Sequence, residues 1–378
     1  MRKSLTVLLA PLLLLAAYLA FWPVPVEPVA WSPPQDRGYT GPHAANTRLA
    51  GLSMVDIGGN EGPEHVAEGP DGRLYAAVLS GGILRMEPGG DRMEPWANTG
   101  GRVLGFDFDA SGNLIAADAY RGLLSVAPDG AVTVLADTVT VDGKADPIRY
   151  ADAAVVAPDG TVYLTDASRR FGAKEWGGTF EASVLDILEQ SATGRVLAWD
   201  PATRAARVVM EGLSFANGLA LSADGSHLFV NETGRYRVWK VPVAALAGAP
   251  VQAASPPEGV RPLLENLPGF PDNLMRGRDG LLWLGFAKPR SPVMDGLAQR
   301  PALRAATLRL PRVLWPVPKA YGHVIAFDEE GRILHDLQDP TGAYPETTSV
   351  TETADRLYVQ SLHAKALGWL PRSALERP

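Results

Sequence analysis

The sequence predicts an all-β protein, a six-bladed β-propeller, with an N-terminal transmembrane or signal-anchor helix and short helical insertions. The chain of 378 residues is rich in turn-forming residues, with 39 glycines and 32 prolines. A hairpin phrase recurs six times, and 40 residues separate the turns at Gly72 and Gly112, enough for the four short strands of one blade. Sustained 3.6-residue periodicity, which a helical solenoid requires, is missing from most of the chain.

The first 22 residues predict a membrane segment. Arg2 and Lys3 precede an uncharged apolar run of 18 residues, 5–22, which is long enough to cross a bilayer. The apolar run is longer than the core of a usual signal peptide, and Pro33 directly follows the small-residue pair, which makes that pair a poor cleavage site. We therefore favour a retained anchor over a cleaved signal peptide. The basic end predicts that the propeller lies on the non-cytoplasmic side, periplasmic or lumenal, and is secreted if the segment is cleaved.

Residues 23–48 predict a stiff, extended linker, because five prolines occur in its first half. Residues 49–378 then form the propeller. The formal net charge of -7 provides no basic face for a nucleic acid. The absence of cysteine excludes disulfides, thiolate nucleophiles and cysteine-bound zinc.

The repeated phrase has the pattern of a β-hairpin. Each turn is followed by a run rich in Leu, Val, Tyr or Trp, and an Asp-Gly pair between strand-like runs is a strong hairpin signal. The turns are Asp71-Gly72, Ser111-Gly112, Asp159-Gly160, Asp224-Gly225, Asp279-Gly280 and a degenerate Ala354-Asp355. Six turns predict six blades.

Two insertions interrupt the repeats. Residues 171–193 contain a short helix-forming stretch, 181–189, and residues 291–320 are basic and amphipathic. Long insertions in compact domains are often lids or binding loops. For the second insertion, a surface helix packed on the propeller is as consistent with the sequence as a lid or a helix that faces an anionic membrane.

Polar residues recur at one position in the repeats. Counting eight residues back from each turn glycine gives an oxygen-bearing side chain in four repeats: Glu64, Asp152, Asn217 and Asp272. The second and sixth repeats carry Leu104 and Thr347 at this position. The strand before the turn is the innermost strand of a blade, so these side chains should form a ring at one mouth of the central channel.

Such a ring predicts a metal site. Three carboxylates in close proximity repel one another unless a cation is bound. Carboxylate and amide oxygens suit calcium first, and magnesium or manganese next. The alternative is that these residues are solvated channel residues or turn caps, which Asp and Asn often are.

Several phrases also carry a family resemblance. They are E-G-P-E at 61–64, G-N-L-I-A-A-D-A-Y-R-G-L at 112–123, T-V-Y-L-T-D-A-S at 161–168, F-A-N-G-L-A-L-S-A-D-G at 215–225 and L-P-G-F-P-D-N at 267–273. With these phrases the chain resembles the strictosidine synthase-like and gluconolactonase group of six-bladed propellers, which includes paraoxonases and the adipocyte plasma membrane-associated protein. The resemblance covers nearly the whole chain, including the membrane-anchored layout.

The resemblance implies a site and a chemistry. Metal ligands of the family map onto Glu64, Asn217 and Asp272, with Asn273 as a further candidate, and Asp152 stands where the family usually has asparagine. The implied activity is calcium-dependent hydrolysis of lactones or aryl esters, in which the metal polarises the carbonyl and Asp272 acts as the base.

Two departures from the family matter for the reaction. The histidine base of paraoxonases has no counterpart near Leu104. The glutamate that strictosidine synthase uses for amine condensation should fall near Thr348, with Glu346 only a neighbour.

Two other functions stay open. The chain could be a non-catalytic propeller in which calcium stabilises the channel and partners bind the blade loops, or a third class, an amine-aldehyde condensing enzyme, which the missing glutamate disfavours. Candidates for the substrate mouth are Tyr120, Arg121 and His363, for which a blade edge or a packed histidine is the plainer interpretation.

Overall fold

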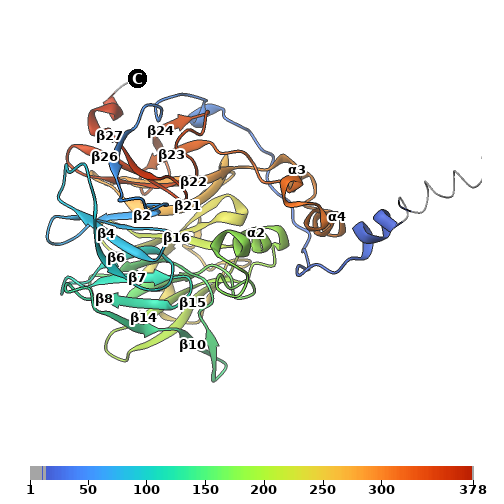
Figure 1. The fold of residues 1–378 in the computed structure, drawn as a ribbon. Helices are drawn as coiled ribbons and strands as arrows, with labels where there is room; N and C mark the ends of the chain where they lie inside the picture. Colours follow the sequence, from blue (N-terminus) through green and yellow to red (C-terminus); the bar gives the residue numbers. More distant parts are fainter. Residues whose placement is uncertain (1–10, 12–13, 377–378) are drawn as a thin grey trace, which may run out of the picture.

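The protein is a six-bladed β-propeller, mostly β with few helices (Figure 1). The computed structural model describes residue 11 and residues 14–376. Blade one contains β2 (His65–Glu68), β3 (Leu74–Ala77), β4 (Gly82–Met86) and β5 (Glu94–Asn98). Blade two contains β6 (Val103–Phe108), β7 (Leu114–Asp118), β8 (Gly122–Val126) and β9 (Val132–Ala136). Blade three contains β12 (Ala151–Val156), β13 (Val162–Asp166), β14 (Gly194–Asp200), β15 (Ala205–Leu213) and the short β19 (Val251–Gln252).

The remaining blades close the ring. Blade four contains β16 (Ala216–Leu221), β17 (His227–Glu232), β18 (Arg237–Pro242) and β20 (Arg261–Leu264). Blade five contains β21 (Gly269–Arg276), β22 (Leu282–Pro289), β23 (Gly322–Phe327) and β24 (Ile333–Asp339). Blade six joins β25 (Thr347–Glu352), β26 (Arg356–Ser361) and β27 (Ala366–Pro371) to β1 (Ser53–Asp56), the first strand of the chain. The two ends of the propeller are thus hydrogen-bonded to each other.

The predicted turns are confirmed as the links between the two inner strands of each blade. The five turn glycines have φ between +70° and +88°, a left-handed conformation that glycine adopts without strain. A separate hairpin, β10 (Thr138–Val141) and β11 (Lys144–Pro147), projects from the third blade's entry loop. The left-handed turn glycines therefore set where the innermost strand of a blade connects to the next strand.

The innermost strands share an irregularity. In blades two to six, the pairing of the innermost strand with the next strand shifts register near the start of the strand. The shift lies between Val103 and Gly105 in blade two, and between residues three apart in the other four blades. A β-bulge of this kind re-aims side chains and is common beside functional sites. The residues inside the five shifts include Leu104, Asp152, Asn217, Asp272 and Thr348.

The sixth blade corrects one expectation. Its turn is closed by the Thr353 N–H and the Arg356 carbonyl, three residues apart, whereas the turn after β2 joins Gly69 to Arg73, four apart. Because this turn is one residue shorter, counting back from Asp355 gives Thr347, one residue too early. Thr348 is the residue inside the bulge, and its hydroxyl donates to the Glu64 carbonyl at 2.7 Å.

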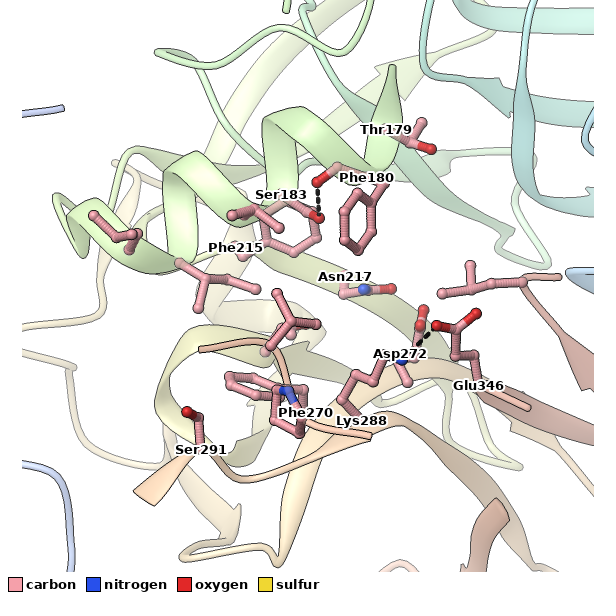
Figure 2. A pocket seen from close by; sticks show the side chains of 18 of the residues that line it. Thr179, Phe180, Ser183, Phe215, Asn217, Phe270, Asp272, Lys288, Ser291 and Glu346 are labelled. Carbon is pink, nitrogen blue, oxygen red and sulfur yellow. Dashed lines mark hydrogen bonds and ion pairs between the residues drawn. The ribbon is translucent and has the colours of Figure 1, made fainter. Parts of the chain in front are cut away.

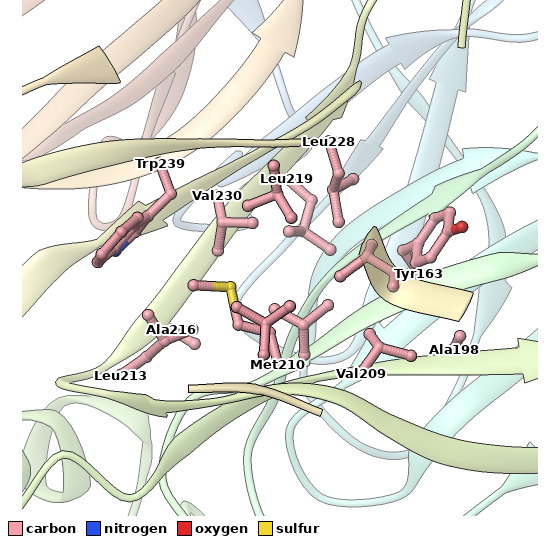
Figure 3. Close-up of a cluster of buried hydrophobic side chains, with 14 of the residues drawn as sticks. Tyr163, Ala198, Val209, Met210, Leu213, Ala216, Leu219, Leu228, Val230 and Trp239 are labelled. Atoms are coloured by element: carbon pink, nitrogen blue, oxygen red, sulfur yellow. The ribbon is translucent and has the colours of Figure 1, made fainter. Parts of the chain in front are cut away.

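The apolar core lies between neighbouring blades rather than at the axis. Between blades three and four, Tyr163 and Ala198 face Leu219 and Leu228 (Figure 3). Leu228 is fully buried. Each blade therefore depends on its neighbours for the burial of its side chains.

Leu228→Ala is expected to lower the free energy of unfolding by about 2–5 kcal/mol, since it removes buried methyl groups and leaves a cavity between two blades. Leu334→Ala is the matched control, because Leu334 on β24 is 42% exposed. Urea denaturation measures both. Equal losses in the two variants would show that the packing between blades three and four is not the main source of stability.

Helices and irregular segments gather on one side of the propeller (Figure 1). They are α2 (Thr179–Glu189), α3 (Pro292–Gly296), α4 (Pro301–Ala306) and the 3-10 turns Thr307–Arg309 and Arg312–Leu314. The insertion at 291–320 is therefore two short helices and two turns rather than one amphipathic helix. Further 3-10 turns are Gly41–His43, Thr233–Arg235, Val243–Ala247 and Arg372–Glu376.

The N-terminal segment lies against this side of the propeller. Residues 14–21 are helical, and residues 22–40 have no regular structure. The Val29 N–H donates to the Glu189 carbonyl at 2.8 Å, and the Arg290 guanidinium donates to the Pro34 carbonyl at 2.7 Å. No helix in the described part of the chain is long and apolar enough to cross a membrane. Most of the predicted anchor, residues 1–10 and 12–13, lies outside the described residues.

Candidate functional site

A cavity of about 160 Å³ lies where the inner strands meet the helical insertions. All four residues of the predicted ring, Glu64, Asp152, Asn217 and Asp272, line it, and each is at most 5% exposed. Leu104 lines it as well. In Figure 2, Asn217, Asp272 and Glu346 lie on one side of the cavity, and the aromatic rings of Phe180, Phe215 and Phe270 lie on the other. The cavity thus has a polar floor and an apolar wall.

Two of the floor carboxylates lack a positive partner. Within the described residues, the ion pairs closer than 4.0 Å involve neither Asp152 nor Asp272. Burial, followed by the charges of Asp272 and Glu64, raises the pKa of Asp152 well above its ordinary value. Burial and the Glu64 charge do the same to the pKa of Asp272, against the opposing effect of the Asn217 amide. In the absence of a cation these carboxyls therefore hold protons at pH values where exposed ones would be ionised.

Glu64 has a partner that the eight-residue count did not reveal. The Arg102 guanidinium pairs with the Glu64 carboxylate, and both side chains are almost fully buried. Burial raises the pKa of Glu64, and the Arg102 charge opposes the rise. Arg102 lies two residues before Leu104, and its backbone N–H donates a hydrogen bond to Asp118 Oδ1 at 2.9 Å. A sequence search for cations beside the predicted ring positions would have found it.

A second charged group lies at the edge of the floor. Lys288 Nζ is 2.6 Å from the Glu346 carboxylate, and the His363 ring pairs with the same carboxylate. Burial alone would raise the pKa of Glu346, but these two partners lower it to about 2. Glu346 in turn raises the pKa of His363. His363, a predicted mouth residue, lines the cavity, as do Glu346 and Lys288, which the sequence did not single out.

The other candidates lie elsewhere. Asn273 is buried, and its amide donates to the Glu64 backbone carbonyl at 2.8 Å, so it braces the ring. Tyr120 packs in the apolar cluster around Phe171, and Arg121 donates to the Thr99 carbonyl. Neither Tyr120 nor Arg121 belongs to the cavity lining formed by the described residues.

The donor set suits a hard cation. The Asn217 Oδ1 atom is buried without a hydrogen-bond partner in the described part of the chain. Four carboxylates and two permanent cations, Arg102 and Lys288, line the cavity, which leaves two negative charges for a divalent ion to balance. Oxygen ligands of this kind fit calcium, magnesium or manganese.

The spacing of the carboxylates is wider than a fully protein-bound ion needs. Of the described residues, only His43, His323 and Asp336 bring three carboxylate or imidazole ligand atoms within 4.8 Å of one another, and they lie outside the cavity. Amide oxygen and water would therefore supply part of the shell of an ion in the cavity.

Comparisons with known proteins identify the family. The strictosidine synthase family model matches residues 152–244, and the model of the N-terminal region of strictosidine synthase-like proteins matches residues 41–86. Protein STRICTOSIDINE SYNTHASE-LIKE 10 of Arabidopsis thaliana is 31% identical over 343 residues, which cover 83% of this chain and 86% of that protein. The chain belongs to the strictosidine synthase-like family.

Other relatives of this strictosidine synthase-like protein differ in coverage. The adipocyte plasma membrane-associated protein of Danio rerio is 30% identical over 384 residues, covering 95% of this chain and 86% of that protein. Protein STRICTOSIDINE SYNTHASE-LIKE 4 of Arabidopsis thaliana is 35% identical over 245 residues, and the match covers 63% of this chain and 60% of that relative. The predicted family is therefore confirmed.

Solved structures show the same fold. A gluconolactonase from Xanthomonas campestris has a TM-score of 0.57 at 18% identity, covering 92% of this chain and 97% of that chain. Regucalcin from Agrobacterium tumefaciens, described as a calcium-binding protein, has a TM-score of 0.52 at 14% identity, covering 84% and 95%. At these identities the likeness extends to the fold alone.

Proposed function

We propose that this strictosidine synthase-like protein is a calcium-dependent hydrolase of lactones or aryl esters, with magnesium or manganese as weaker substitutes. The observation that carries the proposal is Asn217 Oδ1, which is buried without a hydrogen-bond partner among the described residues and shares the cavity floor with Asp152 and Asp272, which form no ion pair with those residues. A hard cation satisfies these three groups at once. The gluconolactonase fold of the structural neighbour is consistent with it.

Different residues of the cavity would have different roles in hydrolysis. When bound, the cation would polarise the ester carbonyl and stabilise the oxyanion that develops there. Glu64, Asp152, Asn217 and Asp272 would hold it, and Asp272 would also accept the proton of the attacking water and pass it to the leaving oxygen. The wall formed by Phe180, Phe215 and Phe270 would hold the apolar part of the substrate and exclude water.

A panel of lactones and aryl esters, assayed with excess chelator and again after calcium is restored, tests the proposal. We expect turnover that disappears with the chelator and returns with calcium. No turnover of any substrate, together with a lower melting temperature after chelation, would favour the alternative of a calcium-stabilised binding platform.

Amine-aldehyde condensation remains the third candidate and is disfavoured. It needs a carboxylate that can take a proton from an amine-derived intermediate. Glu346 is the cavity glutamate nearest the expected position, but Lys288 and His363 lower its pKa to about 2 and leave it a weak base.

We further propose that the helical side of the propeller faces the membrane in which the N-terminal segment is anchored. Arg309 of the insertion donates to the carbonyls of Trp22 at 2.6 Å and Leu19 at 2.9 Å. Val313 and Leu314, in the same insertion, are 88% and 60% exposed. Arginine beside exposed aliphatic side chains suits the surface of an anionic bilayer. Substrate would then enter the cavity from the lipid side.

A polarity-sensitive dye at position 313 is expected to report this contact. The chain contains no cysteine, so Val313→Cys creates a single labelling site. In nanodiscs with anionic lipid, the dye should shift to shorter wavelength and be quenched by spin-labelled lipid. Val134→Cys on β9, a 40% exposed position away from the insertions, is the control. Equal quenching at both positions would contradict the proposed orientation.

A further inference from the structure

Two imidazoles and a carboxylate meet outside the cavity, where the N-terminal segment touches blade five. His43 belongs to the 3-10 turn Gly41–His43, His323 lies on β23, and Asp336 lies on the neighbouring β24. His43 Nδ1 is 2.8 Å and His323 Nε2 is 2.9 Å from the same atom, Asp336 Oδ2. The three ligand-type atoms lie within 4.8 Å of one another. Residues far apart in the chain are thus brought to one point.

The second oxygen of the carboxylate is held by other groups. Asp336 Oδ1 accepts hydrogen bonds from the amide of Asn46 at 3.2 Å and from the amide of Gln338. Gln338 also donates to the His43 carbonyl at 3.1 Å. The amides fix the carboxylate so that Oδ2 faces both imidazoles. Outer hydrogen bonds of this kind orient the ligands of metal sites.

The charge of Asp336 is not balanced by a permanent cation. Its side chain is 8% exposed, and those of His323 and His43 are 1% and 14% exposed. Within the described residues its ion-pair partners closer than 4.0 Å are the two imidazoles alone. Tyr39 and Tyr321, whose rings stack at 4.5 Å, lie beside His323 and add no positive charge. A buried carboxylate without a counter-charge is costly.

We propose that His43, His323 and Asp336 form a zinc site that fastens the N-terminal segment to blade five. Two imidazoles and one carboxylate, with water in the remaining position, are a ligand set typical of zinc. Zinc would bind His43 Nδ1 and His323 Nε2 in their unprotonated form, so a proton held on either atom would move to the other nitrogen of the same ring. Zinc ligands stand about 3.3 Å apart at bond lengths of about 2.0–2.1 Å, so each ring nitrogen would lie a few tenths of an ångström farther from Asp336 Oδ2 than it does now, and the two nitrogens already lie within 4.8 Å of each other.

The site is independent of the proposed hydrolase, because none of its three residues lines the cavity. Its role would be structural. His43 precedes β1 by ten residues, so the ion would hold the incoming chain against the propeller before that chain completes blade six. Binding to the folded state alone would stabilise the protein.

Cobalt titration of the full chain tests the site. The protein is freed of metal by chelation, supplied with calcium to fill the oxygen-lined cavity, and titrated with Co²⁺, whose visible spectrum reports nitrogen ligands. We expect one equivalent of Co²⁺ with visible absorption bands, displacement of these bands by Zn²⁺, and a melting temperature that Zn²⁺ raises by a few degrees.

Matched variants decide which residues bind the ion. His43→Gln lies in the N-terminal segment, outside the blades, and should lose the Co²⁺ bands and the Zn²⁺ stabilisation. His227→Gln, at the half-buried start of β17, should keep both. Absence of Co²⁺ bands in the unmodified chain, or bands unchanged in His43→Gln, would overturn the proposal. Bands lost in Asp272→Asn but not in His43→Gln would assign the ion to the cavity instead.

Discussion

Asp272→Asn is expected to lower kcat/KM for the best ester or lactone substrate by about 10²–10⁴-fold, the usual contribution of a positioned general base. The substitution keeps the size of the side chain and one oxygen, but removes the charge that binds the cation and the group that accepts the proton. Steady-state kinetics at saturating calcium measure the loss. A wild-type-like rate at saturating calcium would show that Asp272 is not the base.

A matched control lies in the same hairpin. Asp279 sits in the turn after β21, is largely exposed and pairs with Arg372 at the surface. Asp279→Asn should leave kcat/KM within about twofold of the unmodified enzyme, since a surface ion pair contributes little. A comparable loss in both variants would place the effect in the stability of the hairpin rather than in the site.

The calcium-free protein is expected to lose stability as pH rises from the ordinary aspartate pKa of 3.8 towards the raised folded-state pKa values of two buried carboxyls. The folded-state pKa values of Asp152 and Asp272 lie above the ordinary value of 3.8. In this window the folded state keeps protons that the unfolded state has released, so the free energy of unfolding falls with increasing pH. The slope is about 1.4 kcal/mol per pH unit for each carboxyl that remains protonated only in the folded state.

Calcium should remove this dependence, because it stabilises the ionised carboxylates in the folded protein. Urea denaturation at several pH values, with chelator and with calcium, gives both slopes. Asp152→Asn removes one titrating group and should reduce the slope in chelator. If the slope were the same with and without calcium, the ring carboxylates would not be the groups that bind the cation.

The fold could be predicted because its signals are local. Four Asp-Gly turns and one Ser-Gly turn each specify a hairpin locally, and with the degenerate turn at Ala354-Asp355 they predict six blades. The closure of blade six by β1 could not be predicted in this way, since the pairing of Ser53 with Trp369 joins the two ends of the chain and no turn connects them. A strand of four residues carries too little pattern to reveal its partner.

Four cavity carboxylate or amide side chains could be predicted because each stands eight residues before a turn glycine, a position that lies inside the bulge of the inner strand in blades three to five. The sixth position was displaced by one residue, because its turn is shorter than the others. The eight-residue count does not reach Arg102, Lys288 or Glu346, because none of them stands at the counted position. Their long side chains, or their places at strand ends, bring them to the cavity. Their positions there depend on tertiary packing rather than on the repeat.

The pairing of β1 with β27 also determines how the molecule carries mechanical load. Any pull on the N-terminal end would reach the propeller through an antiparallel ladder of four residue pairs at the point where the ring closes. Before that, the contacts of Pro34 with Arg290 and of His43 with Asp336 would have to part. The contacts of residues 22–48 with the propeller would therefore break first. The pairing of β1 with β27, which closes the ring, would break only after them.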